Sequence, residues 1–341
     1  MKPRMRESPS NETQLIERIR RRLPARSRAL RIGIGDDAAV LEPPPRGAEW
    51  VLTCDAFLEN VHFLAAAHPP QAVGYKALAR AASDIAAMGA APKFFLLSLA
   101  LPAHRAGDWL DDFLRGMARA ARRFGLVLAG GDTAKHPTVA INITVIGEAP
   151  HGRAVLRSGA RPGDVLCVSG RLGAAQLGLE LFLRGLYRER RWRALLQTHL
   201  YPPLRLALGQ QLARHRIASA MIDTSDGLST DLAHVCEASG VGARVFAGRI
   251  PAVRVPEALR ARSFDAFELA LHGGEDFELL FAVPRRRLKK LPRSFRGVRI
   301  TPIGEIVRGR TIVLVGRDGR ESPLTPRGWD HFRAKSSAIV K

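Results

Sequence analysis

Apolar residues recur at intervals of three and four in several segments, which is the spacing of an amphipathic helix. This pattern predicts an N-terminal helix over residues 11–23. A longer helix is expected to begin at Pro69 and Pro70 and to run to Gly89, because proline favours the first helical turn and glycine the position after the last. Further helices are predicted over 107–124, near 173–186, from Pro202 and after Asp226.

Short apolar runs between these helices predict strands over residues 50–55, 93–101, 126–132, 138–149, 164–170 and 220–223. The run 50–55 is interpreted as a short buried strand that ends on Asp55. Residues 126–132 are interpreted as a strand that leads into a turn at Gly130 and Gly131. Residues 138–149 alternate apolar and polar positions, as a half-buried strand does.

Strands and helices mix in both halves of the chain, which indicates an α/β or α+β fold with mixed sheets packed against helices. The Gly- and Arg-rich segment 151–164 has the composition of a domain junction. We therefore expect two domains, 1–150 and 151–341. A length of 341 residues, of which 46% are hydrophobic, suits two domains of ordinary size.

The composition indicates a cytoplasmic protein. The three cysteines are odd in number and far apart, so neither a disulfide framework nor a zinc spacing is present. The basic N-terminus lacks the apolar core of a signal peptide. The longest nearly apolar run, Phe94–Ala103, is far shorter than the roughly 20 residues of a membrane-spanning helix, so no membrane association is expected.

The net charge of +21 is unusual for a globular protein, and the cations concentrate in residues 18–31, 184–193 and 285–299. Nucleic-acid binding is one explanation, because arginine and lysine neutralise phosphates. Arginine-rich decoration of solvent-facing surfaces is the other, and we favour it because aromatic residues do not alternate with the cations. No specific nucleic-acid partner is expected, although the charge would also attract a polyphosphate substrate.

Aspartates mark the ends of the apolar runs. Asp37, Asp55, Asp132 and Asp223 each follow such a run, and strand ends are where binding loops gather. Asp84 falls on the same helix face as Val73, Ala77, Ala81 and Met88, so a carboxylate lies in an apolar stripe. Because an unpaired buried charge is costly, Asp84 needs an arginine, a bound cation or a cleft.

Taken singly, these aspartates have an ordinary explanation as turn or helix caps, Asp226 among them. Taken together, their hard oxygen atoms are the ligands that magnesium prefers, usually alongside substrate phosphates. Neither a P-loop nor a complete dinucleotide fingerprint competes with this hypothesis. The protein-kinase signature is also missing. The pattern therefore indicates nucleoside triphosphate chemistry.

Several motifs occur in the order found in the thiamine-monophosphate kinase family, which belongs to the aminoimidazole ribonucleotide synthetase-like superfamily. They are "GIGDDAAVL", "TCD" with "ENVHF", "YKALARAASDIAAMGA", "GGDT", "RSGARPGD", "IDTSDGLSTDL", "GGEDFELLF" and "GWDHF". The resemblance implies the two-domain fold of that superfamily. It also implies ATP as co-substrate, several Mg²⁺ ions and a homodimer formed through the N-terminal domains.

The resemblance also implies roles for individual residues. The magnesium ligands would be Asp37, Thr53, Cys54, Asp55, Asp84, Asp132, Asp223 and Asp226. Of these, Asp37, Asp84 and Asp223 would be catalytic. ATP would contact Gly131, Asp132, Arg157 and Ser225, and thiamine monophosphate would contact His62, Glu275 and Trp329. A flat, electron-rich tryptophan face suits a cationic ring, whereas His62 taken alone is better explained as a structural histidine.

Cys54 departs from the family pattern, which usually has threonine at this position. A thiol is a poor magnesium ligand, so a metal site that used this side chain would be weakened, whereas one that used the backbone carbonyl would not. The first motif also departs, as Asn11-Glu12-Thr13, and loses an apolar anchor only.

The resemblance implies in-line transfer of the ATP γ-phosphoryl group to thiamine monophosphate, giving thiamine diphosphate. The carboxylates of "GIGDDAAVL" would then hold cations, with Asp37 the better candidate of the two. The alternatives are a sibling ATP-dependent enzyme of the aminoimidazole ribonucleotide synthetase or selenophosphate synthetase type, and a basic nucleic-acid-binding protein.

Overall fold

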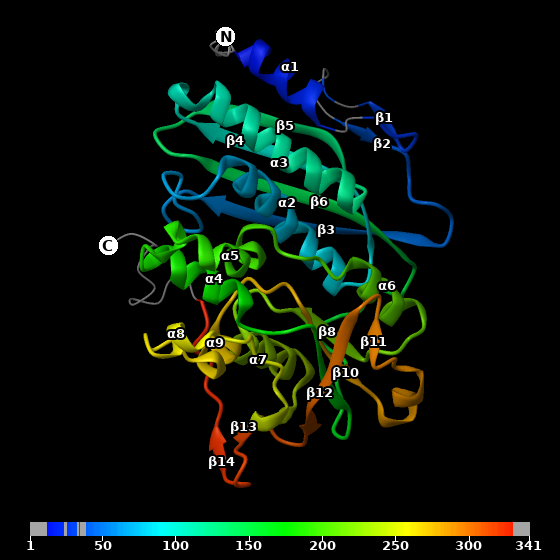
Figure 1. Cartoon of the computed structure of the whole chain (residues 1–341). Coiled ribbons are helices and arrows are strands. Elements are labelled where there is room, and N and C mark those ends of the chain that lie inside the picture. Colours follow the sequence, from blue (N-terminus) through cyan, green and yellow to red (C-terminus); the bar gives the residue numbers. More distant parts are fainter. Residues whose placement is uncertain (1–11, 24–25, 33, 35–38, 330–341) are drawn as a thin grey trace. The chain divides into compact units, whose positions relative to one another are not determined.

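In the computed structural model, residues 12–23, 26–32, 34 and 39–329 are described, and the chain divides into two units (Figure 1). Unit 1 consists of residues up to Ile85 together with Ala91–His151, and unit 2 of Ala86–Ala90 together with residues from Gly152 onward. Each unit has its own sheet and its own buried apolar residues. The α/β (α+β) class expected from the sequence is confirmed.

Unit 1 contains a four-stranded sheet in the order β3 (Ala48–Leu58), β6 (Ala140–Pro150), β4 (Ala91–Leu101) and β5 (Val127–Lys135). All neighbours are antiparallel except β4 and β5, which are parallel. β3 is longer than the strand predicted over 50–55, because it pairs with β6 along its whole length. Asp55 therefore lies inside the strand instead of at its end, and β3 is only partly buried.

The turn predicted at Gly130 and Gly131 does not exist, because β5 continues through both glycines to Lys135. A Cβ atom on Gly131 would lie 1.9 Å from the carbonyl oxygen of Leu97 on β4. Glycine is needed here because the neighbouring backbone comes so close, and the register with β4 shifts at the same place.

Two helices cover one face of this sheet, α2 (Pro70–Ala87) and α3 (Asp108–Phe124) (Figure 1). Both match the sequence prediction closely, and α2 is followed by Gly89 in the left-handed region at φ +68°. The helices cross at two glycines. A Cβ on Gly74 would lie 2.0 Å from the Phe113 carbonyl oxygen, and one on Gly116 would lie 1.8 Å from that of Gln71.

The N-terminal helix α1 (Glu12–Arg22) forms as predicted and packs beside α3 through charge pairs. Arg18 and Arg22 contact the two carboxylate oxygens of Asp111 at 2.5 and 2.6 Å. Asp111 is buried, so the two guanidinium groups compensate a charge that would otherwise be costly inside the unit. The short strands β1 (Leu30–Ile32) and β2 (Val40–Leu41) pair antiparallel after α1.

Unit 2 contains a larger sheet in the order β14-β13-β9-β12-β7-β10-β8, with β11 paired to β12. The strands are β7 (Val165–Ser169), β8 (Ala220–Asp223), β9 (Gly242–Phe246), β10 (Leu279–Val283), β11 (Ser294–Phe295), β12 (Val298–Val307), β13 (Ile312–Val315) and β14 (Glu321–Pro323). Its centre is buried on both faces. Leu280 and Ala282 of β10 join one apolar cluster, and Leu279 and Phe281 join the other.

The helices of unit 2 are α4 (Ala174–Leu183), α5 (Arg193–Leu200), α6 (Leu206–Arg214), α7 (Leu228–Ser239), α8 (Glu257–Arg260) and α9 (Ala266–His272). Short 3₁₀ helices are η1 (Ala103–Arg105) in unit 1, and η2 (Leu186–Arg188), η3 (Arg190–Trp192), η4 (Ala247–Arg249) and η5 (Arg285–Lys290) in unit 2. α7 and α9 pack on one face of the sheet, and α6 on the other. The helix predicted from Pro202 begins only at Leu206, because Pro203 disfavours helical geometry at Pro202.

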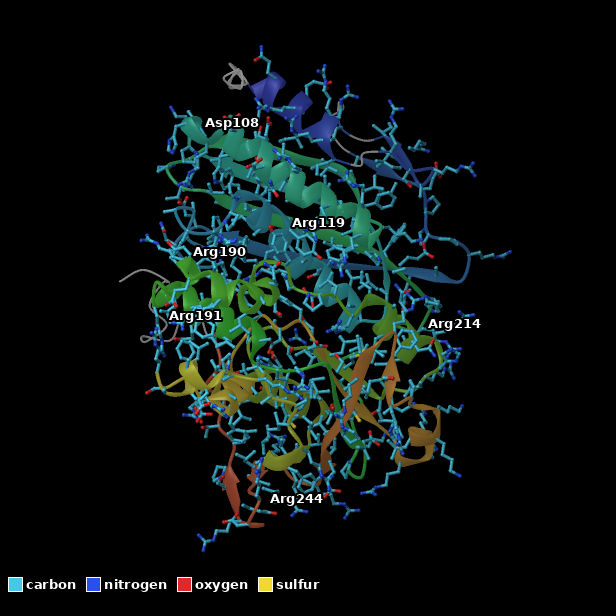
Figure 2. The ribbon with its side chains drawn as sticks, in the orientation of Figure 1. Asp108, Arg119, Arg190, Arg191, Arg214 and Arg244 are labelled. Atoms are coloured by element: carbon cyan, nitrogen blue, oxygen red, sulfur yellow. The ribbon has the colours of Figure 1, made fainter. Side chains whose placement is uncertain are left out.

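Basic side chains project from both units, among them Arg119 of α3, Arg214 of α6 and Arg244 of β9 (Figure 2). In the part of the chain that is described, no helix combines the length and the apolar character that crossing a membrane requires.

The crossing of α2 and α3 predicts a cost for Gly116→Ala. A methyl group at Gly116 would overlap the carbonyl of Gln71, so the helices must separate and lose packing, by about 1–3 kcal/mol. Urea unfolding measures the loss. Gly248→Ala is the control, since its Cβ would meet nothing closer than 3.5 Å. Equal stability of the two variants would contradict the close crossing.

Candidate active site

Thr53 and Asp55 lie on the face of β3 that meets α2, because alternate residues of a strand point to the same side. The Thr53 hydroxyl donates a hydrogen bond to Asp84 Oδ2 at 2.5 Å. The predicted apolar stripe of α2 is present, with Ala77 and Ala81 buried, and Asp84 is partly exposed within it. One partner of this carboxylate is therefore a hydroxyl from the neighbouring strand.

Asp55 is held by a residue that the sequence analysis missed. Arg80 of α2 contacts its two carboxylate oxygens at 3.1 and 3.3 Å, and the guanidinium lies 5.3 Å from the ring centre of Phe57. Arg80 precedes Asp84 by four residues, so the two share one helix face. The four-residue spacing between Arg80 and Asp84 was the feature of the sequence that could have identified Arg80. The guanidinium of Arg80 thus neutralises Asp55.

Cys54 and Asp132 lie on the other face of the same sheet. Asp132 pairs across the strands with Ser98, and Ser98 pairs with Asn142, so their side chains form one row. The Cys54 thiol donates to Asn142 Oδ1 at 2.9 Å. Because this face is opposite to Asp84, only the backbone carbonyl of Cys54 is available to the group around Thr53.

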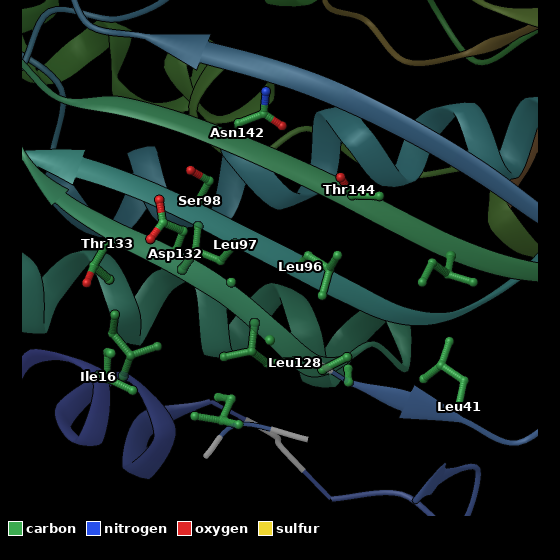
Figure 3. A pocket seen from close by; sticks show the side chains of 17 residues that line it. Ile16, Leu41, Leu96, Leu97, Ser98, Leu128, Asp132, Thr133, Asn142 and Thr144 are labelled. Atoms are coloured by element: carbon green, nitrogen blue, oxygen red, sulfur yellow. The ribbon is translucent and has the colours of Figure 1, made fainter. Parts of the chain in front are cut away.

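This face carries a cavity of about 710 Å³ (Figure 3). Apolar residues of α1, β2, β4 and β5 line much of it, and the polar row lies along its side (Figure 3). Its lining includes Ile16, Leu41, Leu96, Ser98, Leu128, Gly131, Asp132, Thr133, Asn142 and Thr144. Gly131 and Asp132, both expected to contact ATP, are thus found together at one cavity.

The remaining unit 1 candidates are His62 and Asp37. His62 lies in the turn after β3, where its Nδ1 accepts the backbone N–H of Leu58 at 3.0 Å and its ring packs against Phe57. This bond occupies Nδ1 and agrees with the structural explanation of this histidine. Asp37 lies outside the described residues, as do the last three residues of "GWDHF".

Two loops of unit 2 are joined by backbone hydrogen bonds where β8 ends and β10 begins. The N–H of Glu275 donates to Ser225 at 2.8 Å, that of Phe277 to Thr224 at 3.0 Å, and that of Thr224 to Glu278 at 2.8 Å. Glu275 and Phe277 have φ +66° and +50°, a strained region for residues with a side chain. The structure thus brings Asp223, Ser225 and Glu275 together.

Trp329 reaches the same place through the segment after β14. Its backbone N–H donates to the carbonyl of Asp226 at 3.1 Å. The preceding Gly328 donates to the Thr230 hydroxyl, and a Cβ at Gly328 would lie 1.9 Å from the Asp226 carbonyl oxygen. Only glycine allows this approach. The backbones of Trp329 and Asp226 are therefore neighbours.

Arg157 does not join this group through its backbone. Its carbonyl accepts the hydroxyl of Ser239 at the C-terminal end of α7, whereas Ser225 precedes the N-terminal end. A helix of that length spans about 18 Å. The two proposed ATP contacts are thus attached at opposite ends of α7.

The sequence analysis missed three buried acids near these loops, namely Asp231, Asp276 and Glu278. Glu278 binds Arg205 and accepts the Ser169 hydroxyl at 2.5 Å. Asp276 accepts the N–H groups of Gly173 and Ala175, at 2.5 and 2.9 Å, at the start of α4. Asp276 and Glu278 belong to "GGEDFELLF", in which only Glu275 was singled out. The excess of acids in that motif was the available signal.

Burial governs the charge of two of these acids. Burial raises the pKa of Asp276 to about 7, despite its backbone N–H donors. Asp231 accepts the N–H of Gly227, and burial, Asp226 and Asp223 raise its pKa well above the usual range. Asp226 and Asp223 therefore lie close enough to Asp231 to disfavour its charged form. Even so, among the described residues no three His, Cys, Asp or Glu side chains form a group that can hold a metal ion.

Comparison with known proteins assigns both units. The family model "AIR synthase related protein, N-terminal domain" matches residues 35–149, and the corresponding C-terminal domain model matches residues 161–317. The thiamine-monophosphate kinase of Salmonella typhimurium is 37% identical over 330 residues, covering 94% of this chain and 98% of that protein. The chain belongs to the thiamine-monophosphate kinase family.

Other members of the thiamine-monophosphate kinase family agree. The protein of Bacillus subtilis is 34% identical over 309 residues and covers 89% of this chain and 94% of its own length. The crystal structure of the Stenotrophomonas maltophilia kinase is 34% identical, with a TM-score of 0.77 over 93% of this chain and 99% of that one. The structure "AaThiL complexed with AMPPCP and TMP" is also 34% identical, with a TM-score of 0.72 over 94% and 97%. The aminoimidazole ribonucleotide synthetase-like fold expected from the sequence is confirmed.

Asp276 predicts a pH dependence of stability. Its pKa is raised in the folded state, so the folded protein binds a proton more tightly than the unfolded chain between about pH 4 and pH 7. The contribution of this group to stability is therefore complete below about pH 4 and is lost as the pH rises through about 7.

In Asp276→Asn this component of the pH dependence is expected to disappear. Near pH 5 the variant should be less stable than wild type, because an amide cannot accept the N–H groups of both Gly173 and Ala175. Near pH 8 the difference in stability should shrink or reverse, because wild type has by then lost the contribution of Asp276. Urea unfolding across this range, with the exposed Glu257→Gln as control, measures it. A constant difference at all pH values would contradict the assignment to Asp276.

Proposed function

We propose that this chain transfers the γ-phosphoryl group of ATP to the phosphate of thiamine monophosphate, giving thiamine diphosphate. The observation that carries the proposal is the likeness to AaThiL, solved with AMPPCP and TMP, over 94% of this chain. AMPPCP is an analogue of ATP. Donor and acceptor in that complex are thus the two substrates proposed here.

The proposed transfer is direct and in line. Both reactants are anions, so the protein must neutralise their charges and align the acceptor oxygen with the γ-phosphorus. The acceptor phosphate is largely ionised at neutral pH, because its second pKa is about 6. It therefore needs no strong general base, and positioning is the main task of the side chains.

The donor atoms of the site fit magnesium. Asp84 with Thr53 in unit 1, and Asp223 with Asp226 in unit 2, offer hard oxygen atoms only. Magnesium usually keeps several waters and binds one or two carboxylates together with substrate phosphates. It therefore does not require three acids from one unit. When bound, it would neutralise charge on the phosphates.

Asp226 and Asp223 lie near enough to Asp231 to raise its pKa, so acids gather at this loop, and a divalent cation would be favoured beside them. We keep Asp37, Asp55, Asp132 and the Cys54 carbonyl in the proposed set of ligands, with Asp37, Asp84 and Asp223 as catalytic residues. Asp55 is the weakest member, since Arg80 already neutralises it.

The proposed substrate contacts divide between the units. Glu275 and Trp329, whose backbones meet the Ser225–Asp226 loop, would bind thiamine monophosphate, with His62 approaching its phosphate through Nε2. ATP would contact Gly131, Asp132, Arg157 and Ser225. We further propose that the protein is cytoplasmic and forms a homodimer through unit 1. Exposed apolar side chains on the open face of β3, such as Leu52 at 64% exposure, support the dimer.

The proposal predicts thiamine diphosphate when the purified protein is incubated with ATP, Mg²⁺ and thiamine monophosphate. Chromatography detects the product. ADP release with selenide or an aminoimidazole precursor, but not with thiamine monophosphate, would assign the chain to a sibling enzyme of the superfamily.

Asp84→Asn is expected to lower kcat at least about a hundredfold, because the amide can still accept the Thr53 hydroxyl but cannot neutralise a cation. Circular dichroism should show an intact fold. Asp112→Asn on the exposed side of α3 is the matched control and should retain activity. Full activity of Asp84→Asn would exclude Asp84 from the catalytic machinery.

Trp329→Ala is expected to raise the KM for thiamine monophosphate about tenfold, the loss of one cation–π contact, while the KM for ATP stays unchanged. Trp329→Phe should restore most of the affinity, because a phenyl ring keeps the flat face. Steady-state kinetics with each substrate varied in turn measures both constants. A rise confined to the KM for ATP would refute the assigned role.

A further inference from the structure

The two arginine-rich runs of unit 2 look alike in sequence but differ in their surroundings. Residues 184–193 contain Glu189, whose carboxylate lies 2.6 Å from the guanidinium of Arg191. The guanidinium of Arg184 lies 3.1 Å from the carboxylate of Glu180. Rings also cover part of this run: Arg184 lies 4.1 Å from the ring centre of Phe264, and Arg191 lies 4.5 Å from that of Trp192. Arg190 and Arg191 mark the run in Figure 2.

The second run, residues 285–299, carries eight cations and no acid. All of these cations except Arg287 are exposed. Among the described residues, the only carboxylate that pairs with any of them is Glu305, which contacts Arg285 at 3.2 Å. We call residues 285–299 the basic ridge.

The backbone of the basic ridge turns its cations outward. Leu288 and Leu291 are three residues apart, one turn of a 3₁₀ helix, so both pack on the apolar cluster around Phe281. Phe295 of β11 packs on the same cluster. The polar positions between these anchors are left facing solvent.

Arg296 adds a second observation. It forms the tip of the β11–β12 hairpin with Gly297, and both have positive φ, +48° and +80°. Two-residue hairpin turns of this kind favour asparagine or glycine at the first position, and a long side chain there is strained. The hairpin tip carries a guanidinium at a position where the local backbone disfavours it.

From these observations we infer that the basic ridge binds the phosphodiester backbone of nucleic acid without regard to sequence. Six of its eight cations are arginines, whose planar forks match phosphate oxygens in pairs. A row of cations in which only Arg285 pairs with a carboxylate releases counterions when it meets a polyanion, and this release drives binding. A lipid surface fits less well, because Leu288, Leu291 and Phe295 pack on the core and do not project toward a membrane.

The basic ridge is separate from the candidate active site within unit 2. It begins just after Val283, whereas the loop that carries Glu275 precedes Leu279 at the other end of β10. Arg285 confirms this position by donating to the Gly163 carbonyl, before β7 begins. The inference therefore stands whether or not the proposed kinase activity is correct.

The test compares two variants of the full chain that each lose four positive charges. The ridge variant carries Arg286→Gln, Lys289→Gln, Lys290→Gln and Arg293→Gln. The control variant carries Arg188→Gln, Arg190→Gln, Arg191→Gln and Arg193→Gln. Fluorescence anisotropy follows the binding of labelled oligouridine, of oligodeoxythymidine and, separately, of phosphatidylserine vesicles, from about 50 to 200 mM salt.

Wild type and the control variant are expected to bind the oligonucleotides with a steep salt dependence. In the ridge variant, Kd at low salt should rise about tenfold or more, and the slope of log K against log salt should shrink by about 3, since each phosphate contact on a single strand contributes about 0.7. Binding of both oligonucleotides would show that the ridge recognises the phosphodiester backbone common to RNA and DNA. Binding of oligouridine alone would identify RNA as the ligand, and binding of oligodeoxythymidine alone would identify DNA.

Three results would overturn the inference. Equal weakening in the two variants would show that net charge alone is responsible. Absence of oligonucleotide binding by wild type at low salt would show that the ridge is only solvated. Vesicle binding without oligonucleotide binding would assign the ridge to a membrane surface. A far-ultraviolet circular dichroism spectrum and a urea-unfolding midpoint that match those of wild type verify that the ridge variant is folded.

Discussion

Charge compensation inside a protein of high net positive charge is the constraint on which this structure depends. An isolated buried carboxylate costs far more than the fold can supply, so each must meet a cation or several N–H groups. Asp111 meets Arg18 and Arg22, Glu278 meets Arg205, and Asp276 meets the first N–H groups of α4. These contacts fix α1 on α3 and lock the loop that carries Glu275.

The acids around the start of α7 are arranged differently. Asp231 lies near two other carboxylates, Asp226 and Asp223, and accepts the backbone N–H groups of Asp226 and Gly227. Asp84 accepts a neutral hydroxyl. A region where acids crowd one another, in a chain with 53 Lys and Arg residues, is a region suited to added cations.

Much of this arrangement could be predicted from the sequence, because periodicity and turn chemistry are local properties. The helices α2 and α3 and the alternation along β6 required no knowledge of neighbours. The errors arose where a distant segment decides. Gly130 and Gly131 suit a turn locally, and only the close approach of β4 places them in a strand. The local sequence does not reveal a role for Arg80, because its partner Asp55 comes from the separate strand β3.

The acids of unit 1 show most clearly what sequence reasoning could not reach. Asp55 and Asp132 both follow apolar runs, so the pattern treats them alike. The order β3-β6-β4-β5 and the registers of its three pairings place Asp55 on the helix-covered face and Asp132 on the open face. A single layer of backbone thus separates two residues that the motif order groups together.

If Asp55 and Asp132 both contact ATP or its metal ions, the ATP and the ions must reach both faces of the sheet. The edge of a sheet is the place where both faces are accessible. Asp132, on the edge strand β5, satisfies that requirement. Asp55 lies on β3, the strand at the opposite edge of the sheet. A ligand bound at the β5 edge would therefore approach Asp132 and not Asp55, and for this geometric reason we expect the weaker role for Asp55.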